Sequence, residues 1–145
     1  MPEPLVPDVI VNVCQHCSKA GSALPRQWRQ HGFLVAIREI PCGGKLELPY
    51  LMRSVEAATL GVCVVTCPPE ACHHGEGSRR ATLRTAAVRR LLAGVGLSPE
   101  RIEHLRCAAD SPSGHLEQLI RSAVERLNAL GPAWPPPRQT PAEDS

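Results

Sequence analysis

The sequence predicts an α/β fold, with an open four-stranded parallel sheet in the Rossmann or flavodoxin style and helices on both faces. Strand-like and helix-like segments alternate along the chain, which is the order expected for right-handed βαβ units. Among the 145 residues only four are aromatic, so the core has to be built from Val, Leu, Ile and Ala. That aliphatic composition is typical of parallel strands that are covered by helices on both faces.

Four segments have the composition of buried strands, and they lie at residues 9–13, 33–40, 62–66 and 102–107. The first three are nearly continuous runs of β-branched and other apolar residues, as expected of strands without a solvent-facing side. The fourth segment, I-E-H-L-R-C, is interrupted by charged residues and gives a weaker signal. Together they predict the four parallel strands of the sheet.

Helices are expected between and after these strands. A first helix is placed within residues 22–31, and a second begins at Pro49 and ends before Gly61. A third begins with Ser78 as its N-cap and ends near Gly94. Its apolar stripe consists of Ala81, Leu83, Ala87, Val88, Leu91, Leu92 and Val95.

The fourth helix begins after Pro112 and ends at Gly131. Its apolar stripe consists of Leu116, Leu119, Ile120, Ala123, Leu127 and Leu130. Residues 1–131 are therefore predicted to form one domain. Residues 132–145 are rich in proline and polar residues, and they predict an extended C-terminal tail that does not contribute to the core.

The composition excludes several classes of function. A net charge of +2 and four aromatic residues provide neither the basic footprint nor the stacking platform of a nucleic-acid-binding protein. The start, M-P-E-P-L-V-P-D, is not a secretory signal, and no apolar run approaches the roughly 20 residues that span a bilayer. We therefore expect a cytoplasmic protein without membrane insertion, in a compartment that keeps thiols reduced. A phosphate-binding glycine motif and a nucleophile-elbow serine are both absent from the sequence, so no catalytic residue is assigned.

Five of the seven cysteines stand where predicted strands end. Cys14 and Cys17 lie in V-N-V-C-Q-H-C, Cys42 in I-P-C-G-G-K, and Cys67 and Cys72 in V-T-C-P-P-E-A-C. Because the ligand sites of open α/β sheets lie at the carboxyl ends of the strands, these five thiols should converge at one edge. Clustered thiolates bind soft metals, and iron–sulfur clusters and zinc are the natural occupants. The sequence therefore predicts a metal centre at this edge.

The spacing alone leaves the nature of the centre open. Iron–sulfur clusters and zinc both accept four thiolates, so an iron–sulfur site and a zinc-stabilised structural or interaction module satisfy the pattern equally well. A dithiol oxidoreductase that acts through Cys14 and Cys17 is a third interpretation, although it leaves three cysteines unexplained. Cys63 lies inside a strand and is interpreted as a core residue. Cys107 ends the fourth strand without a surrounding motif and is a weaker candidate for a ligand.

Three cysteine motifs follow one another in a fixed order along the chain. The run C-Q-H-C is followed by Cys42-Gly43-Gly44-Lys45 and then by T-C-P-P-E-A-C-H. They resemble the C-x-x-C, Cys-Ser-Gly-Arg and Gly-Cys-His-Pro-Gly-Asp-Cys-His motifs of the delta subunit of methyl-viologen-reducing hydrogenase, a small iron–sulfur subunit that docks on heterodisulfide reductase. In both, a glycine-rich link into a basic helix follows, and the resemblance extends over residues 9–131.

The resemblance implies a [2Fe-2S] electron-transfer subunit whose ligands are four of the five residues Cys14, Cys17, Cys42, Cys67 and Cys72. Such subunits pass electrons between a hydrogenase or formate dehydrogenase module and the flavin subunit of a heterodisulfide-reductase-like complex, and related copies accompany methylenetetrahydrofolate reductases. The implied partners are therefore oxidoreductase subunits that carry flavin and iron–sulfur centres. Two stretches, 43–45 and 68–71, depart from the family motifs. They surround the thiolates without removing one, so they bear on the reduction potential and on the docking partner.

Overall fold

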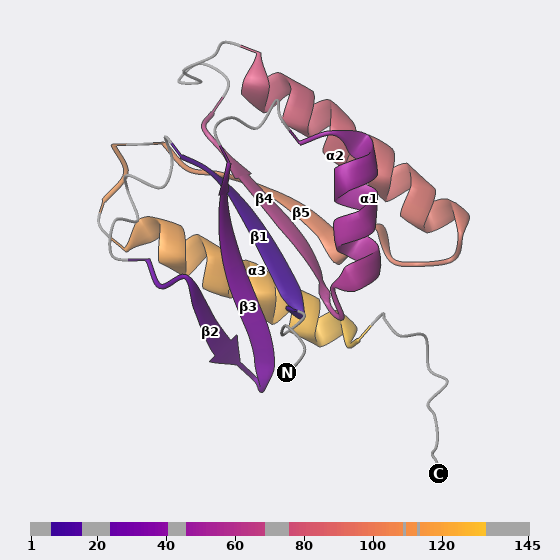
Figure 1. Ribbon diagram of the computed structural model, residues 1–145, viewed down its shortest axis with the longest axis horizontal. Helices are drawn as coiled ribbons and strands as arrows, with labels where there is room; N and C mark the ends of the chain where they lie inside the picture. The colour runs from indigo at the N-terminus through magenta and orange to yellow at the C-terminus, as the bar shows by residue number, and fades with distance from the viewer. Residues whose placement is uncertain are drawn as a thin grey trace, which may run out of the picture.

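The structure is a computed structural model, and it describes residues 7–15, 24–40, 46–68, 76–108, 110–112 and 114–132. Within these residues the chain forms one five-stranded sheet flanked by three α-helices (Figure 1). The strands are β1 Val9–Cys14, β2 Gln27–Gln30, β3 Phe33–Ile40, β4 Gly61–Thr66 and β5 Ile102–Arg106. The helices are α1 Leu48–Ala57, α2 Gly77–Gly94 and α3 His115–Leu130, and a short 3₁₀ turn, Pro99–Arg101, precedes β5.

The strand order is β2-β3-β1-β4-β5, and neighbouring strands are parallel except for β2 with β3. Without the edge strand β2, this is the order of a flavodoxin-like sheet, in which the chain adds strands first on one side of β1 and then on the other. The winding reverses between β1 and β4, so the carboxyl ends of these two strands are the expected ligand site. The α/β class and the helices on both faces are confirmed, while the sheet has five strands where four were predicted.

The additional strand comes from a segment for which a helix was predicted. Residues 24–31 contain no helix, so the helix placed within 22–31 is wrong over this part, and β2 pairs antiparallel with the start of β3. His31 and Gly32 connect the two strands with φ angles of 55° and 81°, the two positive values that a tight hairpin turn requires. Gly32 therefore belongs to a hairpin turn and does not end a helix.

Helices cover both faces of the sheet (Figure 1), and an apolar layer fills the space on each face. α3 covers one face, where it packs against Val9, Val11 and Val13 of β1. The buried residues of α3 are Leu116, Ile120, Ala123, Val124 and Leu127, which confirms the stripe predicted for the fourth helix. α1 and α2 cover the other face, where they pack against Ile10 of β1 and the apolar residues of β4. No helix in the described part of the chain is long and apolar enough to cross a bilayer.

The stripe predicted for α2 is only partly correct. Its residues Ala81, Val88 and Leu92 are buried against the sheet. Three other residues of the predicted stripe remain exposed, with exposed fractions of 60% for Leu83, 47% for Leu91 and 73% for Val95. Two hydroxyl residues, Ser78 and Thr85, complete the buried face instead. Ser78 lies one residue inside the helix, which begins at Gly77, so its side chain faces the protein interior and is not the N-cap.

Candidate metal centre

Three of the described cysteines lie at the carboxyl edge of the sheet. Cys14 is the last residue of β1, Cys67 directly follows β4, and Cys107 directly follows β5. Continuing the pairing of these neighbouring strands puts Cys67 opposite Cys107 and Cys14 opposite Thr66, so Cys14 lies within one residue of the level of the other two. The backbone N–H of Cys107 donates to the carbonyl oxygen of Thr66 at 2.9 Å, which ties the end of β5 to the end of β4. All three cysteines are buried, with 6%, 3% and 2% of their surface exposed.

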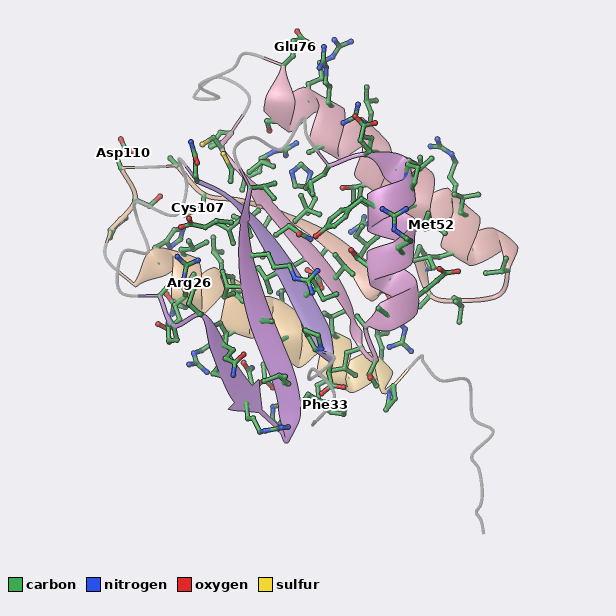
Figure 2. The ribbon with its side chains drawn as sticks, in the orientation of Figure 1. Arg26, Phe33, Met52, Glu76, Cys107 and Asp110 are labelled. Carbon is green, nitrogen blue, oxygen red and sulfur yellow. The ribbon has the colours of Figure 1, made fainter. Side chains whose placement is uncertain are left out.

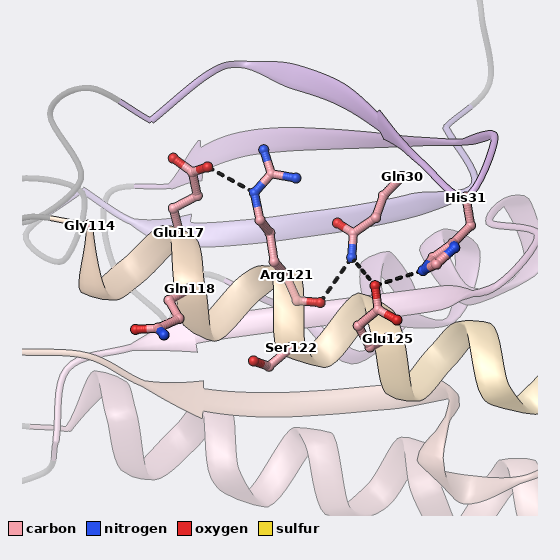
Figure 3. Close-up of a pocket in the computed structure, with 8 residues that line it drawn as sticks. All are labelled: Gln30, His31, Gly114, Glu117, Gln118, Arg121, Ser122 and Glu125. Carbon is pink, nitrogen blue, oxygen red and sulfur yellow. Dashed lines mark hydrogen bonds and ion pairs between the residues drawn. The ribbon is translucent and has the colours of Figure 1, made fainter.

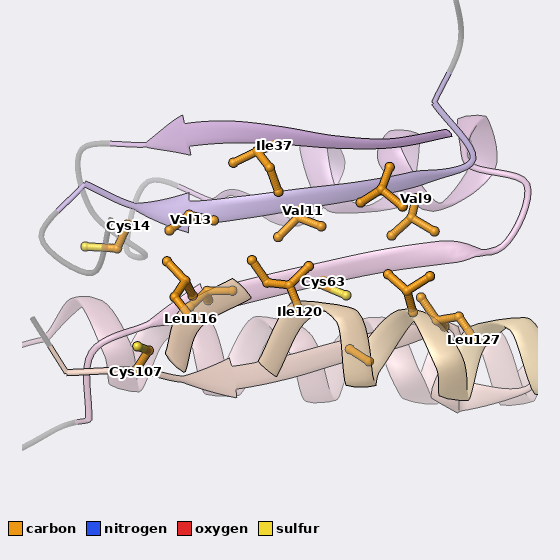
Figure 4. Close-up of a cluster of buried hydrophobic side chains, with 14 of the residues drawn as sticks. Val9, Val11, Val13, Cys14, Ile37, Cys63, Cys107, Leu116, Ile120 and Leu127 are labelled. Atoms are coloured by element: carbon orange, nitrogen blue, oxygen red, sulfur yellow. The ribbon is translucent and has the colours of Figure 1, made fainter. Parts of the chain in front are cut away.

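The carboxyl edge of the sheet, where these cysteines lie, includes the point at which the winding of the sheet reverses between β1 and β4. Figure 4 shows Cys14 and Cys107 at one end of the apolar layer beneath α3, with Cys63 in its middle. Figure 2 shows that Cys107 lies toward one end of the sheet and Phe33 toward the opposite end. Cys14 and Cys67 end the two strands between which the winding reverses. The structure thus brings two of the five predicted ligands to the place where open α/β sheets bind their ligands.

The other three predicted ligands, Cys17, Cys42 and Cys72, lie outside the described residues. Among the residues that are described, no group of three or more His, Cys, Asp or Glu side chains is arranged to hold a metal ion. A centre at this edge would therefore be completed by residues of the segments that follow β1, β3 and β4. The full ligand set stays a prediction.

Cys63 is a buried residue of the core, as predicted. It is fully buried in β4 and belongs to the apolar layer beneath α3. Burial and, to a smaller extent, the carboxylate of Glu103 raise the pKa of its thiol to about 12. The raised pKa agrees with a thiol that is enclosed by apolar side chains inside the core.

Cys107 is better placed than its sequence context indicated. No motif surrounds it, yet its side chain lies in the same apolar layer as those of Cys14 and Cys67. Its thiol is 3.7 Å from the carbonyl oxygen of Ala108. The signal that could have found it is its place at a strand end, because Cys107 directly follows β5 as Cys67 directly follows β4.

A buried polar network that the sequence did not predict lies next to Cys67. The hydroxyl oxygen of Thr66 is 2.7 Å from Nε2 of His104 and 3.2 Å from the hydroxyl oxygen of Ser78. These contacts join the end of β4 to β5 and to the first turn of α2. The partners are 38 and 12 positions apart in the chain, so no local pattern indicates them.

The far side of the His104 ring completes the network. Its Nδ1 is 3.4 Å from the hydroxyl oxygen of Thr82, which also accepts a hydrogen bond from Arg106 at 2.8 Å. Burial, followed by the positive charges of Arg106 and Arg89, lowers the pKa of His104 to about 4. The imidazole is therefore neutral at neutral pH, and one ring nitrogen donates while the other accepts.

A polar groove of about 640 Å³ lies between α3 and the turn that joins β2 to β3 (Figure 3). Its Glu125 accepts hydrogen bonds from Gln30 at 2.8 Å and from Nε2 of His31 at 2.7 Å. Gln30 also donates to the carbonyl oxygen of Arg121 at 3.1 Å, and Arg121 pairs with Glu117 at 2.8 Å. These contacts fasten the hairpin to α3. None of the predicted site residues lines the groove.

The sheet order and the buried thiols at the carboxyl ends of β1 and β4 define an α/β protein with a cysteine site at its switch point. The family model of the methyl-viologen-reducing hydrogenase delta subunit matches residues 9–131 of this chain. The match spans all five strands and all three α-helices. The chain therefore belongs to this family, which confirms the resemblance found in the cysteine motifs.

Individual relatives agree with this assignment. The iron-sulfur subunit of the F420-non-reducing hydrogenase of Archaeoglobus profundus is 26% identical over 133 residues, covering 91% of this chain and 96% of that one. The iron-sulfur subunit of the vhc F420-non-reducing hydrogenase of Methanococcus voltae is 23% identical, covering 91% and 92%. One subunit of the ferredoxin:CoB-CoM heterodisulfide reductase of Methanosarcina mazei is 26% identical over 128 residues, covering 87% of this chain but 16% of that one. The chain is thus similar both to separate subunits and to one segment of a longer polypeptide.

Proposed function

We propose that this chain is a [2Fe-2S] electron-transfer subunit of a multi-subunit oxidoreductase. The observation that carries the proposal is the pair of buried cysteines, Cys14 and Cys67, at the ends of the two strands that flank the switch point. The proposal is supported by membership of the delta-subunit family. It is supported further by relatives that are named iron-sulfur subunits and align over nearly their whole length.

The residues present fit such a cluster. Four of the five residues Cys14, Cys17, Cys42, Cys67 and Cys72 would hold it, since a [2Fe-2S] cluster takes four thiolates. Cys14 and Cys67 expose little of their surface, so the chain would shield this side of the cluster from water. When bound, the cluster supplies one-electron transfer, and the chain supplies the ligands, the burial and the hydrogen bonds that set its reduction potential.

The proposed partners are redox subunits on two sides of the cluster. One is a hydrogenase, formate dehydrogenase or methylenetetrahydrofolate reductase module, and the other is the flavin subunit of a heterodisulfide-reductase-like complex. Relatives that are named as hydrogenase and heterodisulfide reductase subunits support partners of this kind. The proposed location is the cytoplasm, where free thiols remain available for a metal.

Protein purified without air tests the cofactor. We expect a red-brown preparation with about two irons and two labile sulfides per chain, and a paramagnetic signal that appears on one-electron reduction. A colourless preparation with one tightly bound zinc ion would contradict the proposal and would favour a structural zinc module.

A further inference from the structure

The polar network next to Cys67 fastens both ends of the segment that connects β4 to α2. Thr66 is the last residue of β4 and Ser78 is the second residue of α2, and their hydroxyl oxygens are 3.2 Å apart. Both residues are buried, with 2% and 1% of their surface exposed. The residues between them include Cys67 and Cys72, two of the five candidate ligands. A hydrogen bond between the two hydroxyl groups thus closes the base of a ligand-bearing segment.

One assignment of donors and acceptors satisfies every contact of this network. Thr82 donates its only hydroxyl proton to the carbonyl oxygen of Ser78 at 3.0 Å, and its oxygen accepts from Arg106 at 2.8 Å. In this assignment Nδ1 of His104 carries the ring proton and donates to Thr82 at 3.4 Å. Because the ring is neutral, Nε2 carries no proton and accepts from the hydroxyl group of Thr66 at 2.7 Å.

This assignment also fixes the direction of the remaining bond. The hydroxyl group of Thr66 donates its proton to His104, so the oxygen of Thr66 accepts a hydrogen bond from the hydroxyl group of Ser78. Without the acceptor on His104, one of the two buried hydroxyl protons would have no partner within the network. An unsatisfied buried donor costs more free energy than an ordinary hydrogen bond contributes, so the ring determines whether the bond at the base of the segment is stable.

We propose that His104 is a positioning residue of the metal centre, which holds Thr66 and Ser78 as an Nδ1-protonated ring and so positions Cys67, the residue that follows Thr66. The inference rests on the proposed function, since the segment acts as a ligand carrier only if a cluster is bound there. Ligands that are held in place before binding lose less conformational freedom when the metal binds. Groups that orient metal ligands typically change metal affinity by about 10-fold to 100-fold.

The ring tautomer is the first test, and it needs no metal. In the ¹⁵N NMR spectrum of the full-length protein near neutral pH, His104 should show a protonated Nδ1 and an unprotonated Nε2. Replacement of Thr66 by Val should shift the Nε2 resonance, because the hydroxyl proton that it accepts is removed. A ring protonated on Nε2 would overturn the proposal.

Two threonine variants provide the second test. Thr66→Val and Thr85→Val both replace a buried hydroxyl group by a methyl group, but Thr85 Oγ1 has no hydrogen-bond partner among the described residues. We expect Thr66→Val to lose iron to a chelator about tenfold faster than wild type, the factor that corresponds to one lost hydrogen bond. It should also speed amide hydrogen exchange at the end of β4 and in the first turn of α2, and Thr66→Ser should restore both rates. Thr85→Val should match wild type.

The outcomes separate this inference from the proposed function. A protein that purifies without an iron–sulfur cluster would refute the proposed function, while the tautomer and the hydrogen exchange would still report on the positioning network. A protein with a cluster whose iron loss and exchange are unchanged in Thr66→Val would refute the role of His104 alone. If Thr66→Val does not fold, Ser78→Ala tests the same bond from the donor side, with the same expected direction in both rates.

Discussion

The guanidinium group of Arg101 donates a hydrogen bond to the carbonyl oxygen of Gly131, the residue that caps the C-terminal end of α3. The same group reaches the carbonyl oxygens of Leu60 at 3.2 Å and Leu130 at 3.4 Å. Only 8% of Arg101 is exposed, and burial lowers its pKa. One side chain therefore joins the end of α3 to the turn that precedes β4, and it satisfies carbonyl groups that a helix end leaves without partners.

Replacement of Arg101 by Met should lower the free energy of unfolding by about 2–4 kcal/mol, because several carbonyl groups lose a charged donor. Urea denaturation measures this loss. Arg79→Met is the matched control, since Arg79 is 70% exposed and pairs with Glu76, which is 57% exposed. The control should cost about 1 kcal/mol or less. Equal losses in the two variants would contradict the role assigned to Arg101.

Gly61 lies where an added side chain has no room. A Cβ atom at this position would lie 2.2 Å from the carbonyl oxygen of Arg101 and 2.9 Å from Cδ2 of Leu127. Gly61→Ala should therefore push β4 away from the 3₁₀ turn and destabilise the fold by about 2 kcal/mol or more. Gly94→Ala is the control, because an added Cβ meets no described atom within 4 Å. Its thermal midpoint should rise slightly while that of Gly61→Ala falls, and a fall in both would count against this account.

His104 should make the stability of the fold sensitive to acid. The pKa of His104 is about 4 in the folded chain, whereas an unperturbed imidazole in the unfolded chain has a pKa of 6.5. Between these two pH values the unfolded chain binds a proton that the folded chain excludes. The contribution is complete above pH 6.5 and is lost as the pH falls toward about 4, with a magnitude of at most about 3 kcal/mol. Urea unfolding across this window measures it. His104→Gln should flatten the dependence, and an unchanged slope would contradict the shifted pKa.

The two faces of α2 should respond differently to the same truncation. Leu92 is 2% exposed and packs on the sheet, so Leu92→Ala should cost about 2–4 kcal/mol. Leu83 is 60% exposed, and removal of the same atoms from it should cost less than about 1 kcal/mol. Denaturant unfolding of both variants measures the difference. Equal costs would mean that the helix presents another face to the sheet.

Substitutions of Cys67, which follows β4, and of Cys63, inside β4, should distinguish a metal ligand from a core residue. Cys67→Ser should lower the iron content sharply, because this residue ends a strand at the proposed centre. Cys63→Ala should leave the iron content unchanged and cost about 1 kcal/mol or somewhat more in stability, since it only removes a buried thiol from the core. Iron analysis of both purified variants is the measurement. Similar iron loss in the two would show that Cys63 has been assigned to the wrong class.

The parallel strands could be predicted nearly to the residue, because a strand buried on both faces is a continuous apolar run. β3, for example, has the predicted bounds Phe33–Ile40. β2 could not be predicted in the same way, since it has four residues and Trp28 is the single apolar one among them. A glycine after such a segment is compatible with a helix end and with a hairpin turn, and only the pairing with β3 decides between the two.

The candidate site could be predicted where its residues follow strand ends. Cys14 and Cys67 were found in this way because the end of an apolar run is a local signal. His104 was not found, since it stands in a strand with charged neighbours and its partner Thr66 is 38 positions away. The register of β4 with β5 brings the two together, and a single sequence does not reveal that register.

The hairpin has a consequence for how copies of this protein behave at high concentration. β3 is the longest strand in the described part of the chain, with eight residues, and its first half is apolar. Left open, such an edge would recruit strands from other chains and begin aggregation. β2 occupies that edge with four residues that include Arg29, and the hydrogen bond between His31 and Glu125 holds the turn against α3. The hairpin thus protects the apolar half of β3 from pairing with other chains, a role that is independent of electron transfer.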